Sequence, residues 1–234
     1  QTSRVVGFEQ LLAQLCVPGN LVSRIQILER TVPDSGEAMQ RSYARRGIQD
    51  GKYADQAYRE ILRSVPDVQQ GHESYVAVSI DGRAARSDIR AAGGGDQGAA
   101  AVVFRELRSI ADNLEPAGVR VLGWMPPRLF GFVCRTAFDP AARDTLEFRG
   151  GGTRDDRGGD EGLPAGVDLG AAGPIHAENS WDHYRTDSAF HRVWWAQELP
   201  RREVPAGFLW PVVLGTDVPR TLSMVLEPRD PATA

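Results

Sequence analysis

The chain has 234 residues, a formal net charge of −4 at neutral pH and 41% hydrophobic residues. This length is enough to bury a core as one large domain or two small ones. The nearly balanced charge argues against a surface built mainly to hold nucleic acid, and no apolar run approaches the length of a membrane span.

Helical and strand periodicities alternate along most of the chain. Apolar residues at helical spacing predict helices over residues 8–16, 53–65, 97–114 and the segment between Pro127 and Asp139. Alternation of period two predicts strands over residues 21–31, 73–81, 119–124 and 221–227. A further helix carrying Met39 and Tyr43 is expected after the break at Pro33.

Residues 190–200 are the densest aromatic run of the sequence and include Trp194 and Trp195. In an extended conformation this run places a large aromatic residue on each face of a strand. A strand that is apolar on both faces is typical of a sheet covered on two sides. We therefore predict a buried central strand here, within an α/β (α+β) fold that has a mixed β-sheet with helices packed on it.

The composition changes between Arg149 and Gly173, where the first part of the segment contains no apolar residue. Such a segment cannot bury anything, and a loop this long in a compact domain is either functional or disordered. We interpret residues 149–173 as one long flexible insertion. The rest of residues 1–234 is expected to form a single soluble domain.

Candidate catalytic features are few. The glycine-rich turn at residues 93–98 precedes a helix, where phosphate can sit, but no lysine follows it, and Lys52 is the only lysine of the chain. Cys134 falls on the apolar face of a predicted helix, and neither it nor Cys16 belongs to a CxxC pair, which favours buried thiols over a disulfide or a metal site. No nucleophile elbow is present.

Histidines and carboxylates gather in one part of the sequence, in a mixture that can bind a metal. Their spacings match no metal motif, however, and the residues fall on different predicted elements: His176, Glu178, Asp182, His183, Asp187 and His191. We therefore expect no catalytic residue, no cofactor and no metal, and a chain that is not an enzyme. A glycosyltransferase-like enzyme that acts on a nucleotide-sugar is the alternative, since aspartates at strand or helix ends can hold a metal.

Aromatic and arginine residues are interspersed in the same part of the sequence. The tryptophans are expected in the core and the arginines in a solvated rim, but two other interpretations stay open. One is a module that stacks the bases of single-stranded nucleic acid, and the other is a protein interface, in which these residue types are the usual anchors. The candidate partner-binding residues are Trp181, Tyr184, Arg185, Arg192, Arg201 and Arg202.

Three stretches carry a family resemblance: VSRIQILERTVPD at 22–34, RAAGGGD at 90–96 and NSWDHYRTDSAFH at 179–191. Together they resemble an actinobacterial family of membrane-anchored proteins. That family is similar in layout to the amino-terminal, non-motor part of type IV secretion ATPases used in conjugation, and is related to the EccE component of type VII secretion. The resemblance runs over nearly the whole chain, although the insertion at 149–173 is longer than the family pattern.

The resemblance implies a transmembrane anchor before Gln1 and further chain after Ala234, and the absence of an initiator methionine also suggests a fragment. It implies a central domain on the cytoplasmic side of the cell membrane. The expected function is non-enzymatic assembly: docking of partner subunits in a secretion or conjugative transfer machine, with a motor ATPase among the candidate partners. No direct contact with nucleic acid is expected, and the family supplies no catalytic residue.

Overall fold

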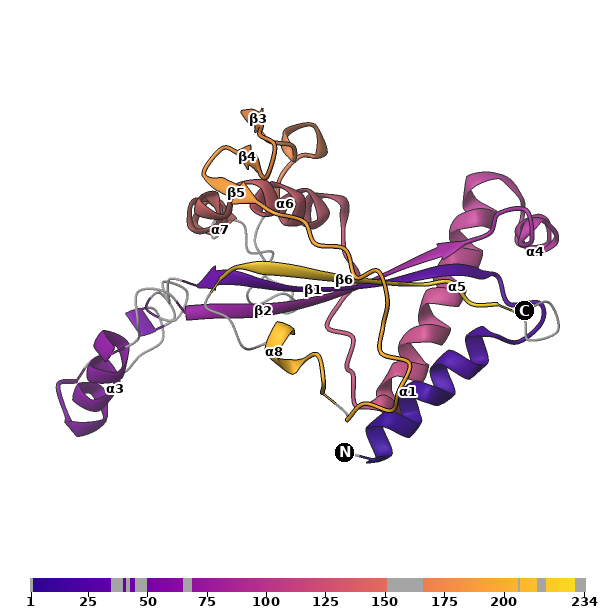
Figure 1. Ribbon diagram of the computed structural model, residues 1–234, viewed down its shortest axis with the longest axis horizontal. Coiled ribbons are helices and arrows are strands. Elements are labelled where there is room, and N and C mark those ends of the chain that lie inside the picture. Colours follow the sequence, from indigo (N-terminus) through magenta and orange to yellow (C-terminus); the bar gives the residue numbers. More distant parts are fainter. Residues whose placement is uncertain are drawn as a thin grey trace. The chain divides into compact units, whose positions relative to one another are not determined.

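A computed structural model of the chain describes the backbone of residues 2–34, 40, 43–44, 50–64, 69–150, 166–205, 207–213 and 218–229. The described elements form an α+β fold, as the sequence predicted. Its strands make two three-stranded sheets, ordered β2-β1-β6 and β3-β4-β5, and Figure 1 labels the elements. The chain divides into two compact units, residues 1–30 with 73–124 and 220–234, and residues 31–72 with 125–219.

The first unit contains a sheet and the helices that cover it. Its strands are β1 (Val22–Asp34), β2 (Gln69–Ile80) and β6 (Arg220–Leu226), although residues 31–34 of β1 and 69–72 of β2 belong to the second unit. Its helices are α1 (Thr2–Leu15), α4 (Arg86–Ala91), α5 (Gly95–Leu114) and the short 3-10 turn η1 (Glu115–Ala117).

Side-chain pairs fix the direction of the strands in this sheet. Ser23 Oγ donates to the carbonyl of Ser79 at 3.2 Å, and Ser74 hydrogen-bonds to Glu29 farther along the same pair of strands. The residue numbers on β2 fall as those on β1 rise, so the two strands are antiparallel. β1 and β6 are antiparallel by the same criterion, because Arg24 pairs with Glu227 and Gln26 pairs with Ser223.

The core of the first unit lies between this sheet and helices α1 and α5, which Figure 1 shows side by side. Apolar residues three or four positions apart on each helix form one buried face. That face packs against β1 in one cluster: Leu11, Leu15, Val22, Ile25, Ile110 and Leu114. The opposite sheet face carries the polar pair of Gln26 and Ser223 and the ion pair of Arg24 and Glu227. This alternation explains why the period-two pattern predicted β1 and β6 correctly.

The second unit contains α3 (Tyr53–Ser64), α6 (Pro127–Phe138), α7 (Arg143–Gly150) and α8 (Trp210–Val213), with 3-10 turns η2 (Pro140–Ala142) and η3 (Leu169–Ala171). It also contains β3 (Ala177–Asn179), β4 (Tyr184–Thr186) and β5 (Ala189–His191). Phe132 of α6 is 2% exposed and Val167 is 9% exposed. A Cβ on Gly131 would lie 2.3 Å from the carbonyl oxygen of Val167, so only glycine lets α6 approach the segment before η3 this closely.

The prediction of a buried central strand at residues 190–200 is wrong. Only Ala189–His191 forms a strand, and residues 192–200 have no regular secondary structure and are all exposed. Trp194 and Trp195 are 86% and 88% exposed. Each strand of this small sheet has three residues, so the sheet offers too little apolar surface to cover the run that follows it.

Other predictions from the sequence have mixed outcomes. The helices over 8–16, 53–65, 97–114 and the segment after Pro127 are confirmed as α1, α3, α5 and α6. The predicted strand at 119–124 is wrong, because those residues have no regular structure. Of the predicted insertion, residues 151–165 lie outside the described residues, while Val167 and Ala172 are buried. The expected helix around Met39 lies almost wholly outside the described residues.

Candidate protein-docking surface

Strands β3, β4 and β5 form a small antiparallel meander that positions the candidate residues. β3 pairs with β4 in the register Ala177 to Thr186, and β4 pairs with β5 in the register Thr186 to Ala189. The two residues between β4 and β5, Asp187 and Ser188, make the turn, and Asp187 has a φ of 38°. This tight turn leaves β5 as an edge strand that leads directly into the tryptophan run.

Thr186 anchors the meander to α6 by its hydroxyl group. Its side chain is completely buried, and Oγ1 donates to the carbonyl oxygen of Phe138 at 2.6 Å. Phe138 is the last residue of α6, where carbonyl groups lack partners within the helix. The same hydroxyl is hydrogen-bonded to Nε2 of His191, so one buried group joins α6, β4 and β5.

Asp187 makes the second anchor. Its carboxylate accepts hydrogen bonds from the backbone N–H groups of Ile175 and His176, at 3.1 and 2.7 Å, and forms an ion pair with Arg135 of α6 at 2.8 Å. The bond from His176, with those from Ile175 and the Arg135 guanidinium, lowers the pKa of the Asp187 carboxyl. Arg135 also donates to the carbonyl of Gly173 and to Asp139, at 2.8 and 2.9 Å.

The outer side of the meander carries a second polar cluster. Asp182 bonds to Nδ1 of His183 at 2.7 Å and forms an ion pair with Arg192. The hydrogen bond from His183, followed by the contacts with Arg192, lowers the pKa of Asp182. The rings of His183 and Phe190 meet edge-on at 5.3 Å, and the guanidinium of Arg185 lies over the Phe190 ring, 5.3 Å from its centroid. These contacts give Arg185 and Arg192, which are both half-exposed or more, partners within the meander.

Large apolar side chains beside this cluster face solvent. We call residues 192–199 the tryptophan segment; its residues Val193, Trp194 and Trp195 are 94%, 86% and 88% exposed. Trp181, in the turn between β3 and β4, is 94% exposed, and Phe190 is 68% exposed. Exposed apolar groups are common on proteins when they are scattered singly, but a group of this kind marks an interaction site.

The structure brings together some of the candidate residues from the sequence and leaves others apart. Tyr184, Arg185 and Arg192 share the meander and its continuation, with Arg185 3.8 Å from Glu178. Arg201 instead forms an ion pair with Glu198 at 2.6 Å, and Arg202 is exposed and makes no hydrogen bond or ion pair with the described residues of the meander. Trp181, which was expected in the core, is among the most exposed residues.

Sequence reasoning missed the residues that hold this surface in place. Arg135, Thr186 and Asp187 form the anchors, and only Asp187 was considered, as a metal ligand. Arg135 lies opposite the apolar residues Leu129, Phe130 and Val133 of the predicted helix, so the local pattern gave no signal for it. Within the part of the chain that the structure describes, no group of three or more His, Cys, Asp or Glu side chains could hold a metal ion.

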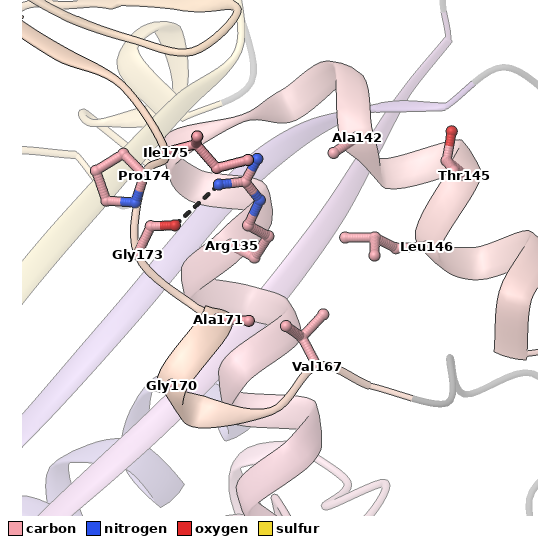
Figure 2. Close-up of a pocket in the computed structure, with 10 residues that line it drawn as sticks. All are labelled: Arg135, Ala142, Thr145, Leu146, Val167, Gly170, Ala171, Gly173, Pro174 and Ile175. Carbon is pink, nitrogen blue, oxygen red and sulfur yellow. Dashed lines mark hydrogen bonds between the residues drawn. The ribbon is translucent and has the colours of Figure 1, made fainter.

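A cavity of about 550 Å³ lies in the second unit between α6, α7 and the segment from Val167 to Ile175. Figure 2 shows Arg135 as the charged residue among its lining side chains, with a guanidinium nitrogen bonded to the Gly173 carbonyl. The other lining groups are small or apolar, Leu146 and Pro174 among them. Since Arg135 is already bonded to Gly173, Asp139 and Asp187, the cavity offers an apolar wall rather than a cluster of polar groups.

Comparisons with models of known protein families, with curated proteins and with solved structures find no match for this chain. Of the helices in the described residues, none is long and apolar enough to cross a membrane. The arrangement of the second unit is therefore the basis for a functional proposal. It combines a rigidly anchored meander with aromatic and arginine side chains that face solvent.

Proposed function

We propose that this chain is a non-enzymatic assembly domain that docks protein subunits through the meander and the tryptophan segment. The observation that carries the proposal is the exposure of Trp181, Trp194 and Trp195, each above 85%. Tryptophan and arginine are the residue types most enriched among the side chains that dominate binding energy at protein interfaces. A partner that covers this surface would remove it from water.

The size of these side chains supports binding of a protein. A tryptophan buries about 150–250 Å² when it is covered. At about 25 cal/mol per Å², each of Trp194 and Trp195 would contribute roughly 4–6 kcal/mol of gross transfer free energy. Part of that sum is lost in ordering the segment and in restricting the two partners. The remainder is still large enough to make these two residues the principal anchors of an interface.

The arginines add directional contacts at the margin of the apolar group. Arg192 is held by Asp182, and Arg185 lies over Phe190, so both guanidinium groups are ordered before a partner arrives. A preordered side chain loses less conformational entropy on binding than a free one. Arg185 and Arg192 are therefore suited to bind carboxylates or backbone carbonyl groups of a partner protein.

The setting of this assembly follows from the family resemblance of residues 22–34, 90–96 and 179–191. We propose that the domain faces the cytoplasm in a membrane-embedded actinobacterial secretion or conjugative transfer apparatus. The partners are other subunits of that apparatus, with a motor ATPase as the first candidate. The same resemblance supports a membrane anchor in the full-length protein.

Co-purification of the full-length protein with products of neighbouring genes tests this proposal. Wild type should retain a membrane or ATPase subunit, and the double variant Trp194→Ser/Trp195→Ser should lose it. Trp210→Ser is the matched control, because Trp210 is also in the second unit and 64% exposed but lies on α8. Retention of no such subunit by wild type would refute the assembly function.

Binding of single-stranded nucleic acid is a second candidate, favoured by the exposed tryptophans near arginines. The local charges argue against it, because Arg185, Arg192 and Arg201 are each paired with a carboxylate of Glu178, Asp182 or Glu198. Those carboxylates repel phosphate groups. Retardation of single-stranded DNA in a salt-dependent manner, lost in Trp194→Ser/Trp195→Ser, would favour this candidate over protein docking.

A further inference from the structure

The tryptophan segment continues an edge strand, and its own backbone is unpaired among the described residues. β5 lies at the edge of the sheet β3-β4-β5, and residues 192–199 follow it directly. No backbone hydrogen bond joins residues 192–199 to any other residue that the structure describes. An exposed edge with free N–H and C=O groups is a template for pairing with another strand.

The residues of this segment are good strand formers. Val193, Trp194 and Trp195 are three consecutive residues of high β-propensity, and the segment places apolar side chains on both of its faces. Such a sequence is suited to pairing with a neighbouring strand. We propose that this neighbour is the tryptophan segment of a second copy of the chain, paired antiparallel, so that two meanders join into one continuous sheet.

The hairpin fixes which backbone groups point to the open edge. Thr186 and Ala189 flank a two-residue turn, so they form a hydrogen-bonded pair across β4 and β5. His191, two residues farther, also directs its N–H and C=O toward β4. If the strand continues, even-numbered residues from Phe190 onward direct theirs to the open edge.

This alternation restricts how two copies can pair. Residues directly opposite each other in an antiparallel pair are both hydrogen-bonded or both not. Even-numbered residues must therefore face even-numbered ones, and Trp194 cannot face Trp195 of the second copy. Among the symmetric pairings that obey this rule, those near the middle of the segment place Trp194, Trp195 or Ala196 opposite its own counterpart.

Charge distinguishes between these three pairings. With Trp195 opposite Trp195 of the second copy, Arg192 faces Glu198 of that copy, and symmetry makes this ion pair twice. With Trp194 at the centre, Arg192 faces Ala196; with Ala196 at the centre, Arg192 faces Pro200. Only the pairing centred on Trp195 joins opposite charges on both sides of the axis.

The existing ion pairs do not oppose this arrangement. Arg192 now pairs with Asp182, and Glu198 with Arg201, and all four side chains are at least a quarter exposed. Exposed ion pairs contribute little to stability, so exchanging one for another is nearly neutral. The dimer gains the cross-strand tryptophan pair and the backbone hydrogen bonds of the joined edges.

The contact area indicates a weak dimer. Three aromatic residues per copy, Phe190, Trp194 and Trp195, can bury on the order of 1,000 Å² in total, which is near the lower limit for a specific interface. We expect a dissociation constant in the micromolar range. The inference rests on the proposed assembly function, because it takes a second copy as one of the docked proteins.

Charge exchange tests the pairing in sedimentation velocity runs on the whole 234-residue chain between about 1 and 200 μM. Arg192→Glu and Glu198→Arg should each weaken dimerisation about tenfold or more, since each places like charges opposite one another twice. The double variant Arg192→Glu/Glu198→Arg should regain the wild-type constant. Monomeric wild type over the whole range, or single variants that dimerise as wild type does, would overturn the pairing.

Cysteine cross-linking tests the register. Residues at position 195 form a non-hydrogen-bonded pair, with Cα atoms about 4.5 Å apart, which suits a disulfide. Trp195→Cys should give a disulfide-linked dimer under mild oxidation, whereas Trp194→Cys, the matched control, should not, because its opposite residue is Ala196. Equal linkage of both variants would overturn the register.

Three further outcomes separate this inference from the proposed function. In the first, the 234-residue chain is monomeric, but the full-length protein still retains membrane or ATPase subunits and loses them when Trp194 and Trp195 are replaced. That result overturns the pairing and leaves the proposed function intact. Sedimentation of a monomeric chain with vesicles of anionic phospholipid, with a blue shift of tryptophan emission, overturns it in favour of a lipid surface. Dimerisation without retention of any subunit would leave the pairing intact and refute docking of other subunits.

Discussion

Replacement of Thr186 by valine tests whether the meander is held to α6 as the geometry indicates. Valine has nearly the same shape as threonine but lacks the hydroxyl, so no cavity forms. The change removes the donor to the Phe138 carbonyl at 2.6 Å and the partner of His191 Nε2. An acceptor left unsatisfied beside a fully buried side chain costs about 1–3 kcal/mol. We expect a loss of about 2 kcal/mol in the free energy of unfolding.

Urea unfolding and thermal unfolding both measure this loss. For a chain of this size, about 2 kcal/mol corresponds to a fall in Tm of about 4–8 °C. Hydrogen exchange should also become faster in residues 184–191, because the anchor joins β4 and β5 to α6. Thr221→Val is the matched control; Thr221 is exposed on β6, and its replacement should change stability by less than about 0.5 kcal/mol. Equal stability of both variants and unchanged exchange in 184–191 would refute the anchor.

Three more substitutions probe the packing and the ionised groups. Gly131→Ala places a Cβ 2.3 Å from the Val167 carbonyl oxygen and should lower the free energy of unfolding in urea by about 1–3 kcal/mol. The control Gly123→Ala has open space around the added Cβ and should not lower it. Equal losses in the two variants would contradict the close approach of α6 to Val167. Ile110→Ala should cost about 2–5 kcal/mol, because Ile110 is 7% exposed, while Leu122→Ala, at 88% exposed, should cost under about 0.5 kcal/mol in the same assay. The lowered pKa of Asp187 means that the folded state binds fewer protons than the unfolded state at acidic pH. The Asp187 carboxylate therefore stabilises the fold above the ordinary aspartate pKa of about 4, and this stabilisation is lost as the pH falls through that value and below. The urea midpoint of wild type should therefore fall between pH 6 and 3 more steeply than that of Asp187→Asn, and identical slopes would show that the carboxylate is not held in its ionised form.

Periodicity predicted the elements whose burial follows one face of the element itself. Leu11 and Leu15 of α1 and Ile110 and Leu114 of α5 repeat at helical spacing, and all four are buried in one cluster. In β1, Ile25 and Ile27 pack in or against this cluster, whereas Arg24 and Gln26 form polar pairs on the other face of the strand. Here the local pattern and the tertiary environment agree, so the sequence was sufficient.

The tryptophan run shows where that reasoning fails. Alternating aromatic residues indicate a chain that fits a pleated surface, but they do not supply the layer that would cover it. Whether Trp194 and Trp195 are buried depends on the surrounding elements, and the three-residue strands beside them provide no such layer. Trp194 and Trp195, which the sequence predicted to be buried, are therefore exposed residues of the candidate interface.

The anchors of the candidate surface were hidden from sequence reasoning for another reason. Arg135 and Asp187 are far apart in the chain, and nothing in either local pattern indicates that α6 meets the turn between β4 and β5. Thr186 is a small polar residue that is ordinary in a strand, so only its contact with Phe138 reveals its role. In contrast, Tyr184, Arg185 and Arg192 were identified because aromatic and arginine residues cluster locally in the sequence.

Oxidative footprinting of Trp194 and Trp195 is the measurement that tests the docking surface most directly. Hydroxyl radicals label side chains in proportion to their exposure, and mass spectrometry locates the label. We predict strong labelling of both residues in the dilute 234-residue chain, and strong protection of both in full-length protein within its native membrane assembly, with Trp210 labelled equally in both samples. Equal labelling of Trp194 and Trp195 in the two samples, or protection already present in the dilute chain, would contradict the account.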